Sequence, residues 1–228
     1  MGLLALGLTA QNETWVDSPE QRAVEFATLP CVGIQSTSSG YVIDDELVLT
    51  VAHALHETRD FAVADGRGVW RSGDIVRLDL ERDLALVRVD GLRSTPVDEA
   101  PERRVSEWPD TPVRIVGAAA SGTSEASIVR RVKLLTEVVG DRSQQSSRSG
   151  YEVALEIDPG DSGAAILDDA DRLVAIVFAR STARESVAWA TAIDEVDRAP
   201  NEVPPLGCDD DLDIELDLTP PEPARLAG

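Results

Sequence analysis

Between about Pro30 and Ile193, the chain is a succession of short apolar runs separated by glycine, serine, aspartate and proline. Long helical periodicity is absent from this region. The runs have the length, composition and spacing of strands in a sandwich or barrel; examples are YVIDDELVLTVA, DIVRLDL, LALVRVD, VRIVG, SIVRRVKLLTEVV, YEVALEI and LVAIVFA. The pattern predicts an all-β protein.

Changes in texture divide the chain into segments. Residues 92–112, LRSTPVDEAPERRVSEWPDTP, hold four prolines and many charges, which predicts a linker between two β units. A serine-rich stretch at residues 140–150, GDRSQQSSRSG, is typical of a mobile loop beside a site. We expect a domain over 25–195, with one β unit at about 25–105 and another at about 110–195.

The two ends of the chain differ from this domain. Residues 1–24 are expected to form a separate N-terminal segment. Residues 196–228 are acidic and proline-rich, and most of this tail reads as extended or disordered. Within it, apolar and acidic residues alternate over 212–218, a pattern that could also form an edge strand.

The charge balance excludes several classes of partner. The 228 residues include 42 acidic and 21 basic side chains, for a formal charge of −21. Such a chain is a poor match for nucleic acid or for an anionic membrane surface. No segment approaches the roughly 20 apolar residues of a membrane span. The first ten residues, MGLLALGLTA, resemble the apolar part of an export signal, although a frayed or docked N-terminus stays open. Export is the localisation we expect.

The two cysteines, Cys31 and Cys208, lie far apart in the chain and outside any metal-ligand spacing. Two interpretations stay open at this point. The pair could form one disulfide that closes a long loop, or each thiol could be buried as a small hydrophobic group. No metal site and no cofactor are predicted.

Three short stretches carry candidate catalytic residues. LTVAHALHE contains both histidines of the chain, His53 and His56. DPGDSGAAIL places Ser162 in a glycine-flanked turn, where the N–H groups of Gly160 and Ser162 can point to one spot. ERDLALVRV places Asp83 at the start of an apolar strand, where a carboxylate can orient an imidazole. Taken singly, the turn around Ser162 is more simply interpreted as an ordinary loop, and Asp83 as a carboxylate that caps a strand.

Together, VLTVAH, RDLALV and GDSG resemble, in this order, the motifs of the trypsin-like serine peptidases of the chymotrypsin fold. The similarity spans roughly residues 31–193 and includes SSGYVI and SVAWATAI. It implies two six-stranded antiparallel β-barrels with the active site in the cleft between them. It also implies His53 as base, Asp83 as its orienting acid, Ser162 as nucleophile, and an oxyanion hole formed by Gly160 and Ser162. The implied substrate is a polypeptide.

The resemblance also points to a primary specificity pocket. It implies lining positions at Glu156 and near Ala188, with Arg180 at the cleft where the family usually has glycine. Strand alternation sends Glu156 to the face opposite Leu155 and Ile157. Glu156 then either points into the pocket and favours a basic substrate side chain, or lies on a solvated strand face.

The chain departs from the family pattern at three places. GDSGGP is here GDSGAA, a change that affects neither the nucleophile nor the oxyanion hole. Arg180 can narrow the cleft. No IVGG-like stretch follows a basic cleavage site, so Asp161 lacks the amine that pairs with this position in processed family members and needs another partner.

Two other functions compete with a serine peptidase. HALHE resembles a rearranged zinc-hydrolase motif, but its histidines are three positions apart and the glutamate lies outside them. A binding or regulatory module that kept the peptidase fold without activity is the second alternative, supported by Arg180 and by the missing activation terminus. The sequence does not indicate an oligomeric state.

Overall fold

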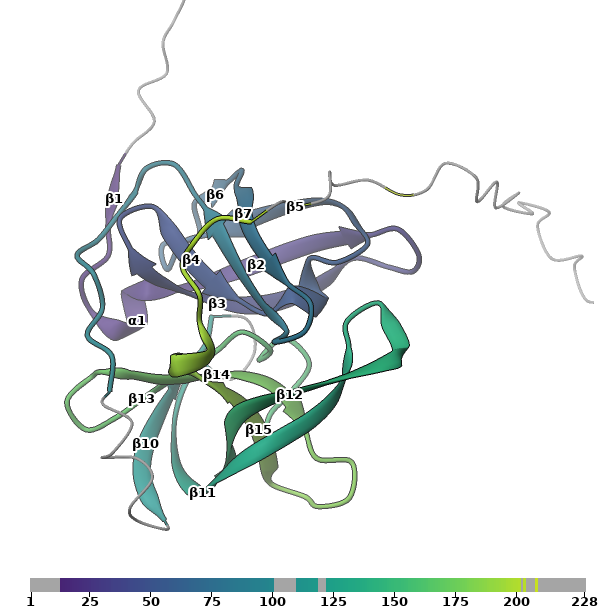
Figure 1. Ribbon diagram of the computed structural model, residues 1–228. Coiled ribbons are helices and arrows are strands. Elements are labelled where there is room, and N and C mark those ends of the chain that lie inside the picture. The colour runs from purple at the N-terminus through teal and green to yellow at the C-terminus, as the bar shows by residue number, and fades with distance from the viewer. Residues whose placement is uncertain (1–12, 101–109, 119–121, 202, 204–207, 209–228) are drawn as a thin grey trace, which may run out of the picture.

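The computed structural model describes residues 13–100, 110–118, 122–201, 203 and 208. Within these residues the regular structure is almost entirely β and falls into two units. Figure 1 shows the first unit, in purple to blue, above the second unit, in teal to green. The predicted all-β class and chymotrypsin-like two-barrel architecture are confirmed.

The first unit is a curled antiparallel sheet in the strand order β6-β5-β2-β3-β4-β8-β7. Its strands are β2 (Ala23–Pro30), β3 (Ser36–Asp44), β4 (Leu47–Thr50), β5 (Thr58–Ala64), β6 (Trp70–Arg71), β7 (Asp74–Asp79) and β8 (Leu84–Arg88). Six strands were expected, and the described sheet has seven. β6 and β7 lie at opposite edges of this sheet, although only Ser72 and Gly73 separate them in the chain. One bent stretch of chain therefore reaches both edges, and the sheet must curl towards closure.

The second unit is a closed barrel in the order β10-β11-β12-β15-β14-β13, which matches the six strands expected for it. Its strands are β10 (Thr111–Val116), β11 (Thr123–Val138), β12 (Asp141–Ala154), β13 (Ala165–Leu167), β14 (Leu173–Arg180) and β15 (Val187–Ala192). β10 pairs with both β11 and β13, which closes the barrel.

Strand β8 of the first unit buries both of its faces, which explains why its run LALV is continuously apolar. On β8, Ala85 and Val87 lie in the core inside the first unit. Leu84 and Leu86, on the opposite face, belong to a second cluster that also contains Leu167 and other residues of the second unit. This shared cluster holds the two units against each other, because burial of apolar surface is the main favourable term in packing.

Residues before the predicted domain start at 25 belong to the folded body. β1 (Thr14–Trp15) pairs in parallel with β9 (Leu92–Arg93). Val16 is buried in the core of the first unit. The predicted N-terminal segment is therefore anchored from Thr14 onward.

The predicted linker at residues 92–112 passes from one unit to the other. The N–H of Val97 donates to the Ile43 carbonyl of the first unit, and the N–H of Ala100 donates to the Leu173 carbonyl of the second. Residues 101–109 lie outside the described part.

Helical structure within the described residues is confined to three short segments: α1 (Pro19–Arg22), η1 (Ala52–Ala54) and η2 (Ile193–Glu195). A reciprocal capping box begins α1, in which the Ser18 side chain accepts from Gln21 N–H and the Gln21 side chain accepts from Ser18 N–H. None of the described helices has the length and apolar character to cross a membrane.

The prediction of a loop at residues 140–150 is wrong, because Asp141–Ala154 forms the strand β12. β12 pairs with β11 along its length but with β15 only from Gly150 onward. The earlier part is thus a two-stranded ribbon that projects from the barrel towards the first unit, as Figure 1 shows. A ribbon with no sheet packed on it needs few apolar residues, so its composition resembles that of a loop.

After η2 the chain crosses back to the first unit. The Asn201 side chain accepts from the Leu78 N–H at 3.0 Å and donates to the Leu78 carbonyl at 2.9 Å. The Asn201 N–H also donates to the Val76 carbonyl. These bonds cover the edge strand β7, so the start of the predicted tail is ordered against the sheet. The alternating stretch at 212–218 lies outside the described residues.

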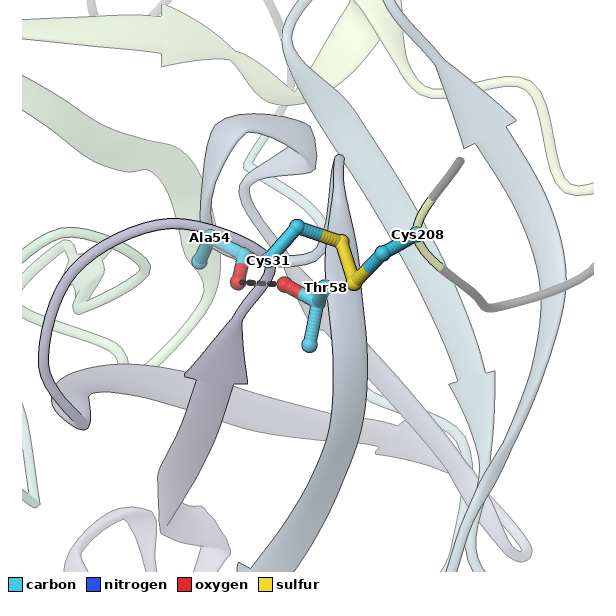
Figure 2. Close-up of a disulfide and its surroundings, with 4 residues drawn as sticks. All are labelled: Cys31, Ala54, Thr58 and Cys208. Carbon is cyan, nitrogen blue, oxygen red and sulfur yellow. Dashed lines mark hydrogen bonds between the residues drawn. A yellow bond between two sulfur atoms is a disulfide. The ribbon is translucent and has the colours of Figure 1, made fainter. Parts of the chain in front are cut away.

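A disulfide joins Cys31 to Cys208, with Cα atoms 5.4 Å apart and a sequence separation of 177 (Figure 2). Cys31 directly follows β2, and its N–H donates to the Glu57 carbonyl. Figure 2 also shows Thr58 beside the disulfide, donating from its hydroxyl to the Ala54 carbonyl. The bond therefore ties the C-terminal segment to the first unit next to η1.

Candidate active site

His53 lies on η1, just after β4, and faces Asp83. Its Nδ1 is 2.8 Å from Asp83 Oδ2 and 3.1 Å from Oδ1. A carboxylate only accepts hydrogen bonds, so we assign the proton to Nδ1, which leaves Nε2 free to act as a base. The His53 side chain is 39% exposed and that of Asp83 only 7%. A buried carboxylate thus orients an imidazole that solvent can reach.

Asp83 occupies the turn between β7 and β8 with a positive φ of 54°, a conformation that aspartate tolerates better than most residues. Its Oδ1 also accepts the backbone N–H of His53 at 2.8 Å. One carboxylate therefore fixes both the backbone and the ring of the histidine. The predicted position of Asp83, just before an apolar strand, is the one observed.

Ser162 lies in a tight turn between β12 and β13, at the boundary of the two units. Its carbonyl accepts the N–H of Ser39 on β3 at 2.7 Å, so the turn is attached to the first unit. Its hydroxyl points to the Phe178 carbonyl at 3.4 Å. Among the described hydrogen bonds, none joins Ser162 to His53. Catalytic contacts are often loose without substrate, so the absence of this bond does not exclude Ser162 as a candidate nucleophile.

The backbone before Ser162 turns sharply at Gly160. Gly160 has φ +109°, which a glycine adopts at low cost, and its carbonyl accepts the Ser39 hydroxyl at 3.1 Å. Ser39 is fully buried. The Gly160 carbonyl is thus held by a partner within the protein, which restrains the turn that carries the Gly160 and Ser162 N–H groups.

Asp161 is 1% exposed and has an internal partner, which the sequence left open. Its Oδ2 accepts the backbone N–H of Asp158 at 2.8 Å. The N–H of Ala164 donates in turn to the Asp161 carbonyl. The turn is therefore stabilised from within.

His56, three residues after His53, lies against the β11–β12 hairpin. Its ring touches Gly140 at the tip of the β11–β12 hairpin, where an added Cβ would come within 2.4 Å of His56 Cε1. The neighbouring Val139 N–H donates to the Leu80 carbonyl of the first unit. The described residues contain no cluster of three or more potential metal ligands. His56 is thus a packing contact for the hairpin.

The two candidate specificity residues Glu156 and Arg180 line one pocket of about 620 Å³, formed by residues 155–158 and 180–187. Leu155 and Ile157 are buried while Glu156 is exposed, as the alternation predicts. Ala188 is fully buried in the core of the second barrel and is not among the lining residues. Its side chain alternates inward on β15, so its neighbour Val187 faces the pocket instead.

The loop that forms this pocket is fixed by Glu152, whose side chain is 3% exposed. Arg184 and Arg130 both bind the Glu152 carboxylate. The hydrogen bond from Arg184 holds the pKa of Glu152 below its usual value, with burial opposing and Arg130 adding to the effect. Arg184 also lies over the Trp189 ring, at 5.6 Å from its centroid. No pattern in the sequence predicts that Glu152 holds this loop.

A second unpredicted residue is Arg148 on β12. Its guanidinium lies 3.9 Å from Asp83 Oδ2 and its residue is 2% exposed. No signal in the sequence marks it, because it lies in the polar stretch that resembles a loop.

Comparisons with known proteins agree with this geometry. A family model described as "Trypsin-like peptidase domain" matches residues 38–176, more than half of the chain. No curated protein sequence matches significantly. The active form of the Rv3671c protease from M. tuberculosis has a TM-score of 0.74 at 20% identity, over 83% of this chain and 86% of that chain.

Two further solved structures are similar in fold. The HtrA-type protease AlgW, solved with a tripeptide, has a TM-score of 0.60 at 20% identity, over 77% of this chain and 57% of that chain. The serine endoprotease from Yersinia pestis has a TM-score of 0.59 at 17% identity, over 77% of this chain and 60% of that chain. With the family match and the two-unit fold together, the chain belongs to the trypsin-like peptidase domain family.

Proposed function

We propose that this protein is a serine endopeptidase that hydrolyses peptide bonds through an acyl-enzyme. The observation that carries the proposal is the His53–Asp83 pair, in which a buried carboxylate holds the imidazole Nδ1 by two hydrogen-bond contacts and the His53 backbone N–H by a third. Ser162 supplies the nucleophile. Its glycine-flanked turn belongs to the second unit and is hydrogen-bonded to Ser39 of the first unit. The proposed chemistry needs neither a metal nor a cofactor.

The proposed mechanism uses each residue in turn. His53 Nε2 takes the Ser162 hydroxyl proton as Oγ attacks the scissile carbonyl carbon, and Asp83 stabilises the imidazolium that forms. The N–H groups of Gly160 and Ser162 bind the oxyanion. His53 then gives its proton to the leaving amine, which breaks the C–N bond. Water repeats the sequence on the acyl-enzyme and regenerates Ser162.

The proposed substrate is a polypeptide, and Glu156 and Arg180 are the proposed determinants of its preference. A carboxylate at the pocket favours a basic side chain through charge-assisted hydrogen bonds. We also propose export, and the Cys31–Cys208 disulfide supports it, because such bonds persist in oxidising compartments.

A specific observation favours a second candidate, an inactive binding module with the peptidase fold. The Ser162 hydroxyl is directed at the Phe178 carbonyl and not at His53. If this position is permanent, the serine has no base and the cleft can only bind.

Labelling with a fluorescent fluorophosphonate probe separates the two candidates. The purified protein should label covalently at Ser162, and Ser162→Ala should not label. Labelling should survive a chelator, which distinguishes it from zinc-dependent hydrolysis. A wild-type protein that melts cooperatively but does not label would favour the binding module.

A further inference from the structure

We propose that Arg148 is a positioning residue, which acts on the catalytic base from the second unit through Asp83. This inference rests on the proposed peptidase function. Arg148 does not reach the reacting atoms itself. Its role is to hold the Asp83 carboxylate in place and to set the charge that His53 experiences.

The contacts of Arg148 cross the boundary between the units. Its side chain extends from β12 of the second barrel to the β7–β8 turn of the first unit. There its NH1 donates to the Glu81 carbonyl at 3.3 Å, and its NH2 lies 3.9 Å from Asp83 Oδ2. Its guanidinium also stacks over the Phe178 ring, at 4.3 Å from the centroid. Asp83 Oδ2 therefore lies near both the His53 ring and a buried cation.

Phe178 links this contact to the nucleophile. Its carbonyl accepts the Ser162 hydroxyl, while its ring supports the Arg148 guanidinium. One residue of β14 thus lies between the cation and the nucleophile. The arrangement gives Arg148 a path to both halves of the proposed catalytic site.

Charged groups surround Arg148 on several elements. Strand β7 contributes Asp79, the β7–β8 turn contributes Asp83, and η2 contributes Glu195. Glu195 accepts the Ser149 N–H, and Arg82 of the turn pairs with both Asp79 and Glu195. Burial lowers the pKa of Arg148, and the carboxylates of Asp83, Asp79 and Glu195 oppose that change. A guanidinium stays protonated under such conditions. The site therefore contains a permanent positive charge.

This charge has a consequence for the base. The Asp83 carboxylate makes the electrostatic potential at the His53 ring more negative. A cation near the same carboxylate offsets part of this effect. We therefore expect Arg148 to weaken the field of Asp83 at the ring, and its contacts to reduce the motion of the Asp83 carboxylate.

The experiment measures the rate of fluorophosphonate labelling against pH for wild type, Arg148→Met and Arg148→Lys. Removing the charge in Arg148→Met should slow labelling at its plateau about tenfold through lost orientation. It should also raise, by about half a unit or more, the pH at which the labelling rate on the acid side reaches half of its plateau. Arg148→Lys keeps the charge and should restore the wild-type midpoint, which a purely structural role would not require.

Lys133→Met is the matched control, because Lys133 is an exposed cation on the adjacent strand β11, opposite Ser149 in register. It should label as wild type does. Melting curves accompany every variant, and Arg148→Gln replaces Arg148→Met if the latter does not melt cooperatively. If a folded neutral variant keeps the wild-type pH of half-maximal labelling on the acid side, the proposed role of Arg148 is overturned while the proposed function stands. A folded wild type that does not label overturns the proposed function and this inference with it.

Discussion

Gly163 lies directly against the backbone of Ser39, so close that an added Cβ would come within 1.8 Å of the Ser39 carbonyl oxygen. Gly163 belongs to the turn that carries Ser162, and Ser39 belongs to β3 of the first unit. Gly163 also has a φ of +91°, which side chains disfavour. The glycine after the nucleophile is therefore required by the contact between the units as well as by the turn.

Gly163→Ala should displace the turn from β3 and misplace Ser162. A displacement of about 1 Å can cost roughly 100-fold in rate, so we expect fluorophosphonate labelling to fall by about that factor or more. Gly68→Ala is the control, because Gly68 also has a positive φ but open space around it. It should label normally and lose only about 1–2 kcal/mol of stability. Normal labelling of Gly163→Ala would contradict the contact's importance.

The triad residues should act as one unit. Ser162→Ala and His53→Ala are each expected to lower peptide turnover by about four orders of magnitude or more, and the double variant should be little worse. His56→Ala tests the choice of histidine, because His56 packs on Gly140 and should not take part in proton transfer. Its turnover should stay within a few fold of wild type. Equal damage from His56→Ala would reassign the base.

The pocket predicts a preference for arginine or lysine before the scissile bond. A peptide library varied at that position measures it. Glu156→Gln should lose cleavage after basic residues, and Arg180→Gln should increase it, because Arg180 lines the same pocket and opposes a basic side chain. Unchanged cleavage after basic residues in Glu156→Gln would remove Glu156 from the specificity. A wild-type preference for small or acidic side chains would show that Arg180 dominates the pocket.

Glu152 should make stability depend on pH. Its pKa is lowered in the folded protein, mainly by the Arg184 hydrogen bond, so its contribution is present above the ordinary glutamate pKa of about 4.3. The contribution is lost as pH falls through the folded value. Glu152→Gln should therefore melt below wild type at pH 7, with the difference shrinking below about pH 4. The exposed Glu137→Gln is the control, and a pH-independent deficit would show that packing, not charge, is responsible.

The Cys31–Cys208 disulfide should stabilise the whole fold. In the chain-entropy view, a bond that closes so long a loop contributes about 4–5 kcal/mol. A variant with both cysteines changed to serine should unfold at a lower denaturant concentration than the oxidised wild type. A reductant should lower the wild-type midpoint to match and leave the variant unchanged. Insensitivity of the wild type to a reductant would count against this role.

Features that depend on neighbours in sequence could be predicted from the sequence. The alternation that buries Leu155 and Ile157 and exposes Glu156 is local, and so are the glycine-flanked turn of Ser162 and the position of Asp83 before β8. The motif order also led to the peptidase family through VLTVAH, RDLALV and GDSG. Short-range patterns report which side of a strand is buried and where the chain turns.

What the tertiary structure decided depends on residues far apart in the chain. Arg148 lies beside Asp83 because β12 projects across the boundary between the units, and a polar ribbon resembles a loop in sequence. Ala188 turned inward because β15 is paired on both sides within a closed barrel. The sequence by itself determined the strand class and the candidate catalytic residues. The contacts that hold Asp83 and Gly163 were decided by packing, since no local pattern encodes which distant backbone will approach.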